Sequence, residues 1–293
     1  MRINPVIALC VLLLALPIPA LAQSATPVAS PVPASGDFAS LVDIGGRSLY
    51  LECHGEGSPT VILVSGYRAS GRFWTDDLLH PDDPRQMVLA GVAETTRVCT
   101  YDRPGTVASI GEENFISRSD PVTQPRTAPE AVAELHALLQ AAEVPGPYVL
   151  AGHSLGGFFA RLYASTYPDE VVAIPGYGDL ETTGFGAYNA IVREAVAASP
   201  LRPMPFAILA HGKPFALPED AQGFTAAEFE GYVRAESEAK AALVPDARFS
   251  IATESGHDIH QDQPELVVEA IQQVVEGVRN PDTWSDLKTC CAE

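Results

Sequence analysis

Short apolar runs alternate with segments of helical period along most of the chain. Apolar runs of this length are typical of strands that are buried on both faces of a sheet. Residues 48–53 alternate between apolar and polar, as in a strand. The apolar runs cover residues 60–64, 97–101, 148–151, 204–210 and 248–253, and each leads into a glycine or a polar residue. We expect a strand at each of these positions.

Between the runs, apolar residues recur every three or four positions, which is the period of an amphipathic helix. Thr127 is placed to cap the first such segment, and Thr225 with Glu228 has the spacing of a capping box. We expect helices over residues 127–142, 155–167, 225–243 and 263–278. This alternation predicts a doubly wound α/β fold, with a mostly parallel sheet, helices on both faces, and ligands bound at the carboxyl ends of the strands.

The first 22 residues have the pattern of a secretory signal peptide. Arg2 supplies the positive charge, residues 6–16 are apolar, and Ala20-Leu21-Ala22 has the small residues of a cleavage site. An uncleaved membrane anchor is the alternative, but a span needs about 20 apolar residues and this run is shorter. We expect cleavage before Gln23, secretion, and no membrane span in the mature chain.

The rest of the chain divides by composition. Residues 23–37 are rich in Pro, Ala and Ser and have no apolar period, which predicts a disordered linker. The alternating pattern occupies residues 38–280, which we expect to form one domain, and residues 281–293 are expected to be a tail.

The charge of the chain limits its partners. The 293 residues include 18 Lys and Arg against 37 Asp and Glu, a formal net charge of -19. Nucleic acids and anionic lipid surfaces attract basic proteins, so this balance argues against both. The expected partner is a small molecule.

Four cysteines remain after the expected cleavage: Cys53, Cys99, Cys290 and Cys291. In an oxidising compartment they could form two disulfides, with three connectivities. Cys53 and Cys99 lie in two of the predicted strands, so a bridge can form between them if those strands are neighbours. The alternative is that both are small buried apolar side chains.

The residues Gly152-His153-Ser154-Leu155-Gly156-Gly157 carry the strongest chemical signal. This G-x-S-x-G pattern follows a predicted strand and opens a predicted helix, the context of a nucleophilic serine on a sharp turn. The glycines are needed because side chains there would collide with neighbouring backbone. The alternative is a glycine-rich helix start in which Ser154 is only a cap.

A serine hydroxyl needs a base to act as a nucleophile near neutral pH. His257 follows the last predicted strand, and Gly256 before it allows a tight loop that directs the ring. His260 is the rival candidate, and His153 is a candidate packing or orienting group.

Together these residues resemble the α/β-hydrolase family over residues 41–279, nearly all of the mature chain. Ser65-Gly66-Tyr67 is similar to the family's oxyanion loop, and Tyr101-Asp102-Arg103-Pro104-Gly105 to its loop after the fourth strand. Gly152–Gly157 resembles the nucleophile elbow, and Gly256-His257 the loop of the catalytic histidine. The resemblance implies that the backbone N–H groups of Tyr67 and Leu155 form an oxyanion hole.

The acid departs from the family pattern, which places Asp or Glu after the sixth or the seventh strand. The run expected as the sixth strand covers residues 171–174 and stops at Pro175-Gly176, and the cap segment that follows is short. Asp179 is our preferred acid; the alternatives are Glu181, Glu219 and Asp220.

These features predict a secreted serine hydrolase that cleaves carboxylic esters through an acyl-enzyme on Ser154. A binding protein without a complete triad is one alternative, and an amidase, peptidase or acyltransferase is another. No metal-ligand spacing or nucleotide-binding motif occurs, so no cofactor is implied. Four aromatic residues are candidates for an acyl pocket, Tyr67, Phe73, Trp74 and Phe158.

Overall fold

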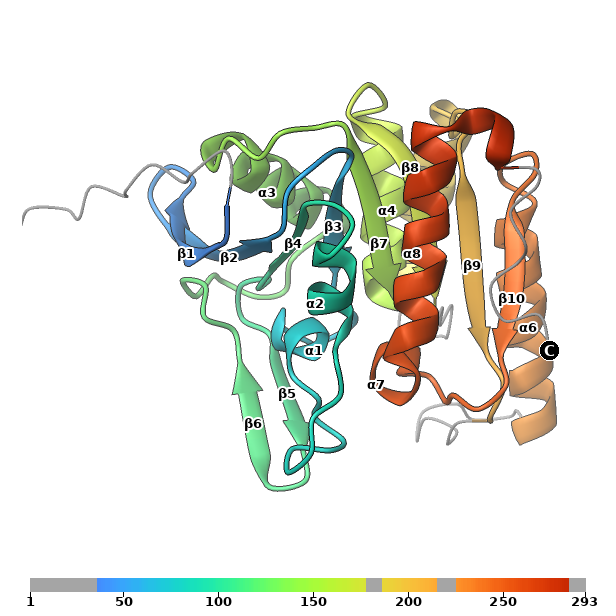
Figure 1. Ribbon diagram of the computed structural model, residues 1–293, viewed down its shortest axis with the longest axis horizontal. Coiled ribbons are helices and arrows are strands. Elements are labelled where there is room, and N and C mark those ends of the chain that lie inside the picture. Colours follow the sequence, from blue (N-terminus) through green and yellow to red (C-terminus); the bar gives the residue numbers. More distant parts are fainter. Residues whose placement is uncertain (1–35, 178–185, 215–224, 285–293) are drawn as a thin grey trace, which may run out of the picture. The chain divides into compact units, whose positions relative to one another are not determined.

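The computed structural model describes residues 36–177, 186–214 and 225–284, all within one compact unit, Pro31–Glu293. An eight-stranded sheet forms its centre (Figure 1). The strand order is β1 (Phe38–Asp43), β2 (Ser48–His54), β4 (Val98–Tyr101), β3 (Thr60–Val64), β7 (Tyr148–His153), β8 (Val171–Tyr177), β9 (Phe206–His211) and β10 (Arg248–Ala252). The strands from β4 to β10 are parallel, and β1 and β2 pair antiparallel. The predicted mostly parallel α/β fold is confirmed.

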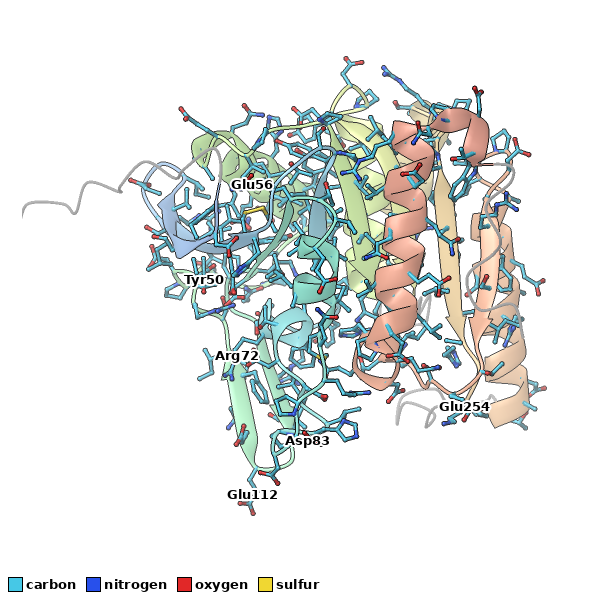
Figure 2. The ribbon with its side chains drawn as sticks, in the orientation of Figure 1. Tyr50, Glu56, Arg72, Asp83, Glu112 and Glu254 are labelled. Carbon is cyan, nitrogen blue, oxygen red and sulfur yellow. A yellow bond between two sulfur atoms is a disulfide. The ribbon has the colours of Figure 1, made fainter. Side chains whose placement is uncertain are left out.

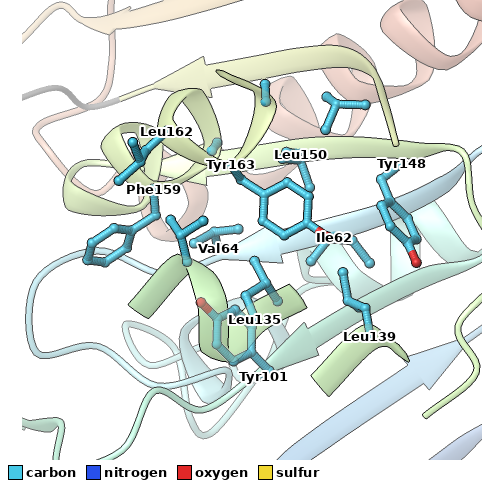
Figure 3. Close-up of a cluster of buried hydrophobic side chains, with 14 of the residues drawn as sticks. Ile62, Val64, Tyr101, Leu135, Leu139, Tyr148, Leu150, Phe159, Leu162 and Tyr163 are labelled. Atoms are coloured by element: carbon cyan, nitrogen blue, oxygen red, sulfur yellow. The ribbon is translucent and has the colours of Figure 1, made fainter. Parts of the chain in front are cut away.

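Helices cover both faces of this sheet, and the apolar strands supply a core to each. On β3, Ile62 and Val64 point to the face covered by α3 (Ala128–Ala141) and α4 (Leu155–Thr166), as Figure 3 shows. Val61 and Leu63 point to the other face, which is covered by α2 (Val88–Ala93) and α8 (Pro264–Arg279). The remaining helices are α1 (Arg72–Thr75), α5 (Gly186–Ala198), α6 (Ala226–Ala241), α7 (Ile259–Asp262) and the 3-10 turn η2 (Pro281–Thr283). None of the described helices is long and apolar enough to cross a membrane.

The predicted helices and strands are found within a few residues of their expected ends. Both predicted threonine caps form: Thr127 with Glu130 at α3, and Thr225 with Glu228 at α6. The pattern missed the hairpin of β5 (Val107–Ile110) and β6 (Glu113–Ile116), because only Phe115 in it is buried.

Strand β8 corrects the prediction of a shortened sixth strand. It runs from Val171 to Tyr177 and includes Pro175 and Gly176. Gly176 pairs with Gly152 of β7 on one side and with Ile208 of β9 on the other. Pairing on both sides overrides the poor strand propensity of Pro175-Gly176.

The folded domain extends beyond the expected boundary at residue 280. Trp284 is 8% exposed, belongs to the core under α8, and donates from its indole N–H to the carbonyl of Asp246. A Cβ on Gly277 would lie 2.6 Å from the Trp284 ring, so the helix and the ring are closely packed. Residues up to Trp284 thus pack with the domain.

Cys53 and Cys99 are disulfide-bonded, as one of the two readings predicted. They are register partners on the antiparallel strands β2 and β4, with Cα atoms 4.0 Å apart (Figure 2). Cys290 and Cys291 lie outside the described residues.

Candidate active site

Ser154 occupies a sharp turn between strand β7 and helix α4. Its backbone has φ 52° and ψ −122°, a conformation that side-chain-bearing residues rarely adopt. A Cβ on Gly152 would lie 2.6 Å from the backbone nitrogen of Gly157, and one on Gly156 would overlap the carbonyl of Val64 on β3. Only glycine fits at these two positions, so the turn can form only with the two glycines of the motif.

The hydroxyl of Ser154 does not cap helix α4, although Ser154 is its N-cap residue. This observation contradicts the reading of Ser154 as a capping serine. The first N–H groups of a helix have no acceptor within the helix. The N–H of Leu155 is one of these groups, so it is a candidate donor to an anion formed beside Ser154.

The loop after β3 lies directly against the turn. A Cβ on Gly66 would be 2.7 Å from Nδ1 of His153 and 3.2 Å from the Cβ of Ser154. The close approach places the residue before Tyr67, the second predicted oxyanion donor, against the turn.

Asp102 and Arg103, which follow β4, hold this loop at two places. Arg103 donates to the carbonyl of Ser65 at 2.5 Å and to the carbonyl of Gly66. Asp102 is fully buried and accepts from the N–H of Gly71 at 2.7 Å. The sequence carries one signal for both residues, an acidic and a basic side chain at the end of an apolar strand, since charges in such a place are kept only with partners.

His257 lies in the loop between β10 and α7, and this loop packs against the residue before Ser154. Nε2 of His153 donates to the carbonyl of His257 at 3.1 Å, and the two ring centroids are 4.8 Å apart. Asp262 closes the loop by accepting from the N–H of Gly256 at 2.7 Å. Among the described residues, no hydrogen bond joins the Ser154 hydroxyl to the His257 ring.

Burial and two neighbouring histidines lower the pKa of His257 well below its usual value of 6.5. Loss of solvent is the largest cause, followed by His153 and then His211 at the end of β9. The ring is therefore neutral at neutral pH, which is the state a general base needs.

The rival His260 belongs to the packed interior. It is 1% exposed, and its ring centroid is 4.8 Å from that of Trp74 and 4.3 Å from that of His153. Its pKa is also well below the usual value, first because of burial and then because of His153 and His257. His257 is half-buried as a residue whereas His260 is fully buried, so His257 is the better placed of the two to meet a substrate.

The preferred acid, Asp179, lies outside the described residues. The alternatives Glu181, Glu219 and Asp220 also lie outside them. Strand β8 extends to Tyr177, two positions before Asp179 in the sequence.

A cavity of about 680 Å³, hereafter the elbow cavity, borders both predicted oxyanion residues. Its wall includes Tyr67, Leu155 and Phe159. Of the four aromatic candidates for an acyl pocket, Tyr67 is 60% exposed and lines this cavity. Phe73, Trp74 and Phe158 are buried in core clusters, so their expected role in the pocket is wrong.

His153, Asp258 and His260 form a group with metal-ligand chemistry that the sequence spacing did not reveal. One potential ligand atom from each lies within 4.8 Å of the others. However, Nε2 of His153 faces the carbonyl of His257, where it must carry its proton and cannot bind a metal. That contact holds the histidine loop against the turn at Ser154.

Comparison with known proteins identifies the class to which this fold and site correspond. The model of the Alpha/beta hydrolase family matches residues 61–234, more than half of the chain. The chain belongs to the alpha/beta hydrolase family.

Individual relatives are distant. An uncharacterized protein of Schizosaccharomyces pombe is 30% identical over 158 residues, which are 48% of this chain and 28% of that protein. An uncharacterized Bacillus subtilis protein, YqjL, is 27% identical over 135 residues, 45% of each chain. The chain thus spans less than half the length of these curated relatives.

Solved structures show the same fold at low identity. A thermophilic esterase of Thermogutta terrifontis has a TM-score of 0.54 and 18% identity, covering 83% of this chain and 99% of the esterase. The serine hydrolase CarC, involved in carbazole degradation, has a TM-score of 0.55 and 15% identity, covering 82% of this chain and 99% of CarC.

Proposed function

We propose that this protein is an exported serine hydrolase that cleaves carboxylic esters through an acyl-enzyme on Ser154. The observation that carries the proposal is the strained turn at Ser154, with a hydroxyl that does not cap its helix. The Leu155 N–H, the Gly66-Tyr67 backbone and the His257 loop surround this turn.

In acylation, Oγ of Ser154 attacks the acyl carbon while His257 takes its proton. The N–H groups of Tyr67 and Leu155 stabilise the oxyanion, and removing one such donor in comparable sites costs about 3 kcal/mol or more. His257 then gives its proton to the leaving alcohol as the ester C–O bond breaks. In deacylation, water attacks the acyl-enzyme, His257 takes its proton and returns it to Ser154.

The triad acid in this proposal is Asp179, with Glu181, Glu219 and Asp220 as alternatives. The acid fixes the tautomer of His257 and stabilises its cation. Loss of the acid in a related triad lowers turnover about 10⁴-fold without removing all catalysis. Gly212 and Lys213, which follow β9, donate from their backbone N–H groups to the carbonyl of Ser255 in the histidine loop.

The disulfide between Cys53 and Cys99 supports the proposed export, because structural disulfides persist in oxidising compartments. Expression in a secreting bacterial host should yield a protein that begins at Gln23. An N-terminal sequence that still begins at Met1 would contradict cleavage.

The hydrolase proposal is tested with 4-nitrophenyl butyrate and the purified mature chain. Ser154→Ala should reduce turnover to the background rate, since no other group then forms the acyl-enzyme. Ser165→Ala, on the same helix α4, should retain wild-type turnover. Equal activity of the wild type and Ser154→Ala would contradict the proposal. A correctly folded wild type without activity on esters or amides would favour the binding-protein alternative.

A further inference from the structure

The charged residues that line the elbow cavity are mostly basic, whereas those of the whole chain are mostly acidic. Acidic residues outnumber basic ones by 37 to 18 overall, yet three arginines and one glutamate line this cavity: Arg68, Arg103, Arg126 and Glu134. A cavity wall of one sign focuses its field inward and raises the local concentration of ions of opposite charge.

Arg126 and Glu134 offset each other. Arg126 donates to the Glu134 carboxylate at 2.6 Å, and Arg47 also pairs with that carboxylate. These side chains form an ionic group beside α3 that also includes Glu130, 3.5 Å from Arg126, so the charge of Arg126 is offset by acidic partners.

Arg68 and Arg103 both donate to backbone carbonyl oxygens. The Nε of Arg68 donates to the carbonyl of Val107 at 2.7 Å, and Arg103 donates to the carbonyls of Ser65 and Gly66. The guanidinium of Arg103 also lies 5.2 Å from the ring centroid of Phe159, which is labelled in Figure 3. The carbonyl of Val107 fixes the guanidinium of Arg68 in place without cancelling its charge.

The position of Arg68 ties this charge to the reaction. Arg68 follows the predicted oxyanion donor Tyr67, and its left-handed backbone, φ 62°, turns the chain at this point. Its side chain is exposed and lines the elbow cavity. The elbow cavity therefore joins the guanidinium of Arg68 to both predicted oxyanion residues, Tyr67 and Leu155.

We propose that the elbow cavity binds the carboxylate of an ester substrate that carries one, and that Arg68 is the main residue selecting it. This inference rests on the proposed ester hydrolase function. Guanidinium groups bind carboxylates through paired hydrogen bonds. An arginine therefore favours a planar carboxylate in addition to favouring negative charge. The carboxylate can belong to the acyl group or to the alcohol, and the experiment separates these two cases.

The test compares each carboxylate ester with its methyl ester. For the acyl side, the pair is 4-nitrophenyl hydrogen adipate and its methyl ester. For the alcohol side, it is 4-carboxyphenyl butyrate and its methyl ester. The measured quantity is the ratio of kcat/KM for the acid over kcat/KM for the methyl ester. Differences in intrinsic reactivity cancel when this ratio is compared between variants.

Arg68→Gln should lower this ratio on the order of tenfold in at least one pair, and Arg68→Glu should lower it further by repelling the carboxylate. Arg202→Gln, which removes an exposed arginine paired with Asp169 far from the cavity wall, should leave the ratio unchanged. A ratio that is the same in the wild type and both Arg68 variants, for both pairs, would overturn the inference.

A binding measurement separates failure of this inference from failure of the proposed function. Adipate binding to the Ser154→Ala chain, measured by calorimetry, needs no nucleophile. Binding that is lost in Ser154→Ala with Arg68→Glu supports the cavity assignment even if no ester is cleaved. Ester cleavage by Ser154 without adipate binding or any Arg68-dependent preference would leave the hydrolase proposal intact and reject the carboxylate site.

Discussion

Ser154 has a backbone conformation that costs about 1–3 kcal/mol for a residue with a side chain. Its neighbours maintain the conformation: Gly156 fits against β3, and Gly66 fits against His153 and Ser154 itself. The position of the hydroxyl is therefore set by backbone packing. Arg103 contributes at the next contact, by holding the carbonyls of Ser65 and Gly66.

The lowered pKa of His257 makes a prediction about the pH dependence of activity. The neutral base is present until the pH falls through its pKa, so kcat/KM should stay constant from neutral pH to below 6.5 and fall only in more acidic solution. His211→Asn should move this acid limb to higher pH, because His211 contributes to the lowering. His80→Gln, at an exposed histidine near Asp77, should not move it.

Measurement of kcat/KM from pH 4 to 8 with a neutral ester tests this prediction. An acid limb with a midpoint at or above 6.5 in the wild type would contradict a buried neutral His257.

At the scale of elements, the position of Ser154 is fixed where β7, α4 and β3 meet. Strand β7 is buried along its whole length, and α4 begins one residue after Ser154. The loops after β3, β4 and β10 meet at this carboxyl edge of the sheet, as expected for a doubly wound fold.

Two glycine substitutions should have opposite effects on stability. Gly156→Ala should lower the free energy of unfolding by about 1–3 kcal/mol, because its Cβ overlaps the Val64 carbonyl and pushes α4 from β3. Gly231→Ala, in α6 with no atom within 4 Å of the added Cβ, should raise it by about 0.5–1 kcal/mol. Urea denaturation measures both, and a Gly156→Ala protein as stable as the wild type would reject the close packing.

Much of the element order was predictable, because buried parallel strands and amphipathic helices leave strong periodic signals. Strand β8 was underestimated because Pro175 hides it locally while its pairing partners lie far away in the sequence. The roles of Ser154 and His257 were proposed from motif context. The role of Arg103 in holding the loop after β3 was not predicted. Its acceptors are backbone carbonyls 37 and 38 residues away, and backbone carbonyls carry no sequence signal.

At the scale of the whole molecule, the two cores and the disulfide hold the sheet. The Cys53–Cys99 bridge joins the antiparallel strand β2 to the strand β4, whose following loop carries Asp102 and Arg103. The disulfide therefore links β2, near one edge of the sheet, to the strand whose following loop holds the predicted oxyanion loop.

Removal of this disulfide should lower the free energy of unfolding by about 2–4 kcal/mol, because the bridge closes a segment of 46 residues. The double variant Cys53→Ala with Cys99→Ala should show the loss in urea denaturation. Dithiothreitol should destabilise the wild type by a similar amount and have little effect on the double variant. Equal stability of the oxidised and reduced wild type would contradict a structural role.

The most direct test of the account is covalent labelling with a fluorophosphonate, followed by mass analysis of the modified peptide. The wild type should gain one adduct, on Ser154, and His257→Ala should label far more slowly, whereas His260→Ala, if folded, should still label. An adduct on another residue, or no adduct on a folded wild-type protein, would contradict the claim that Ser154 is an activated nucleophile.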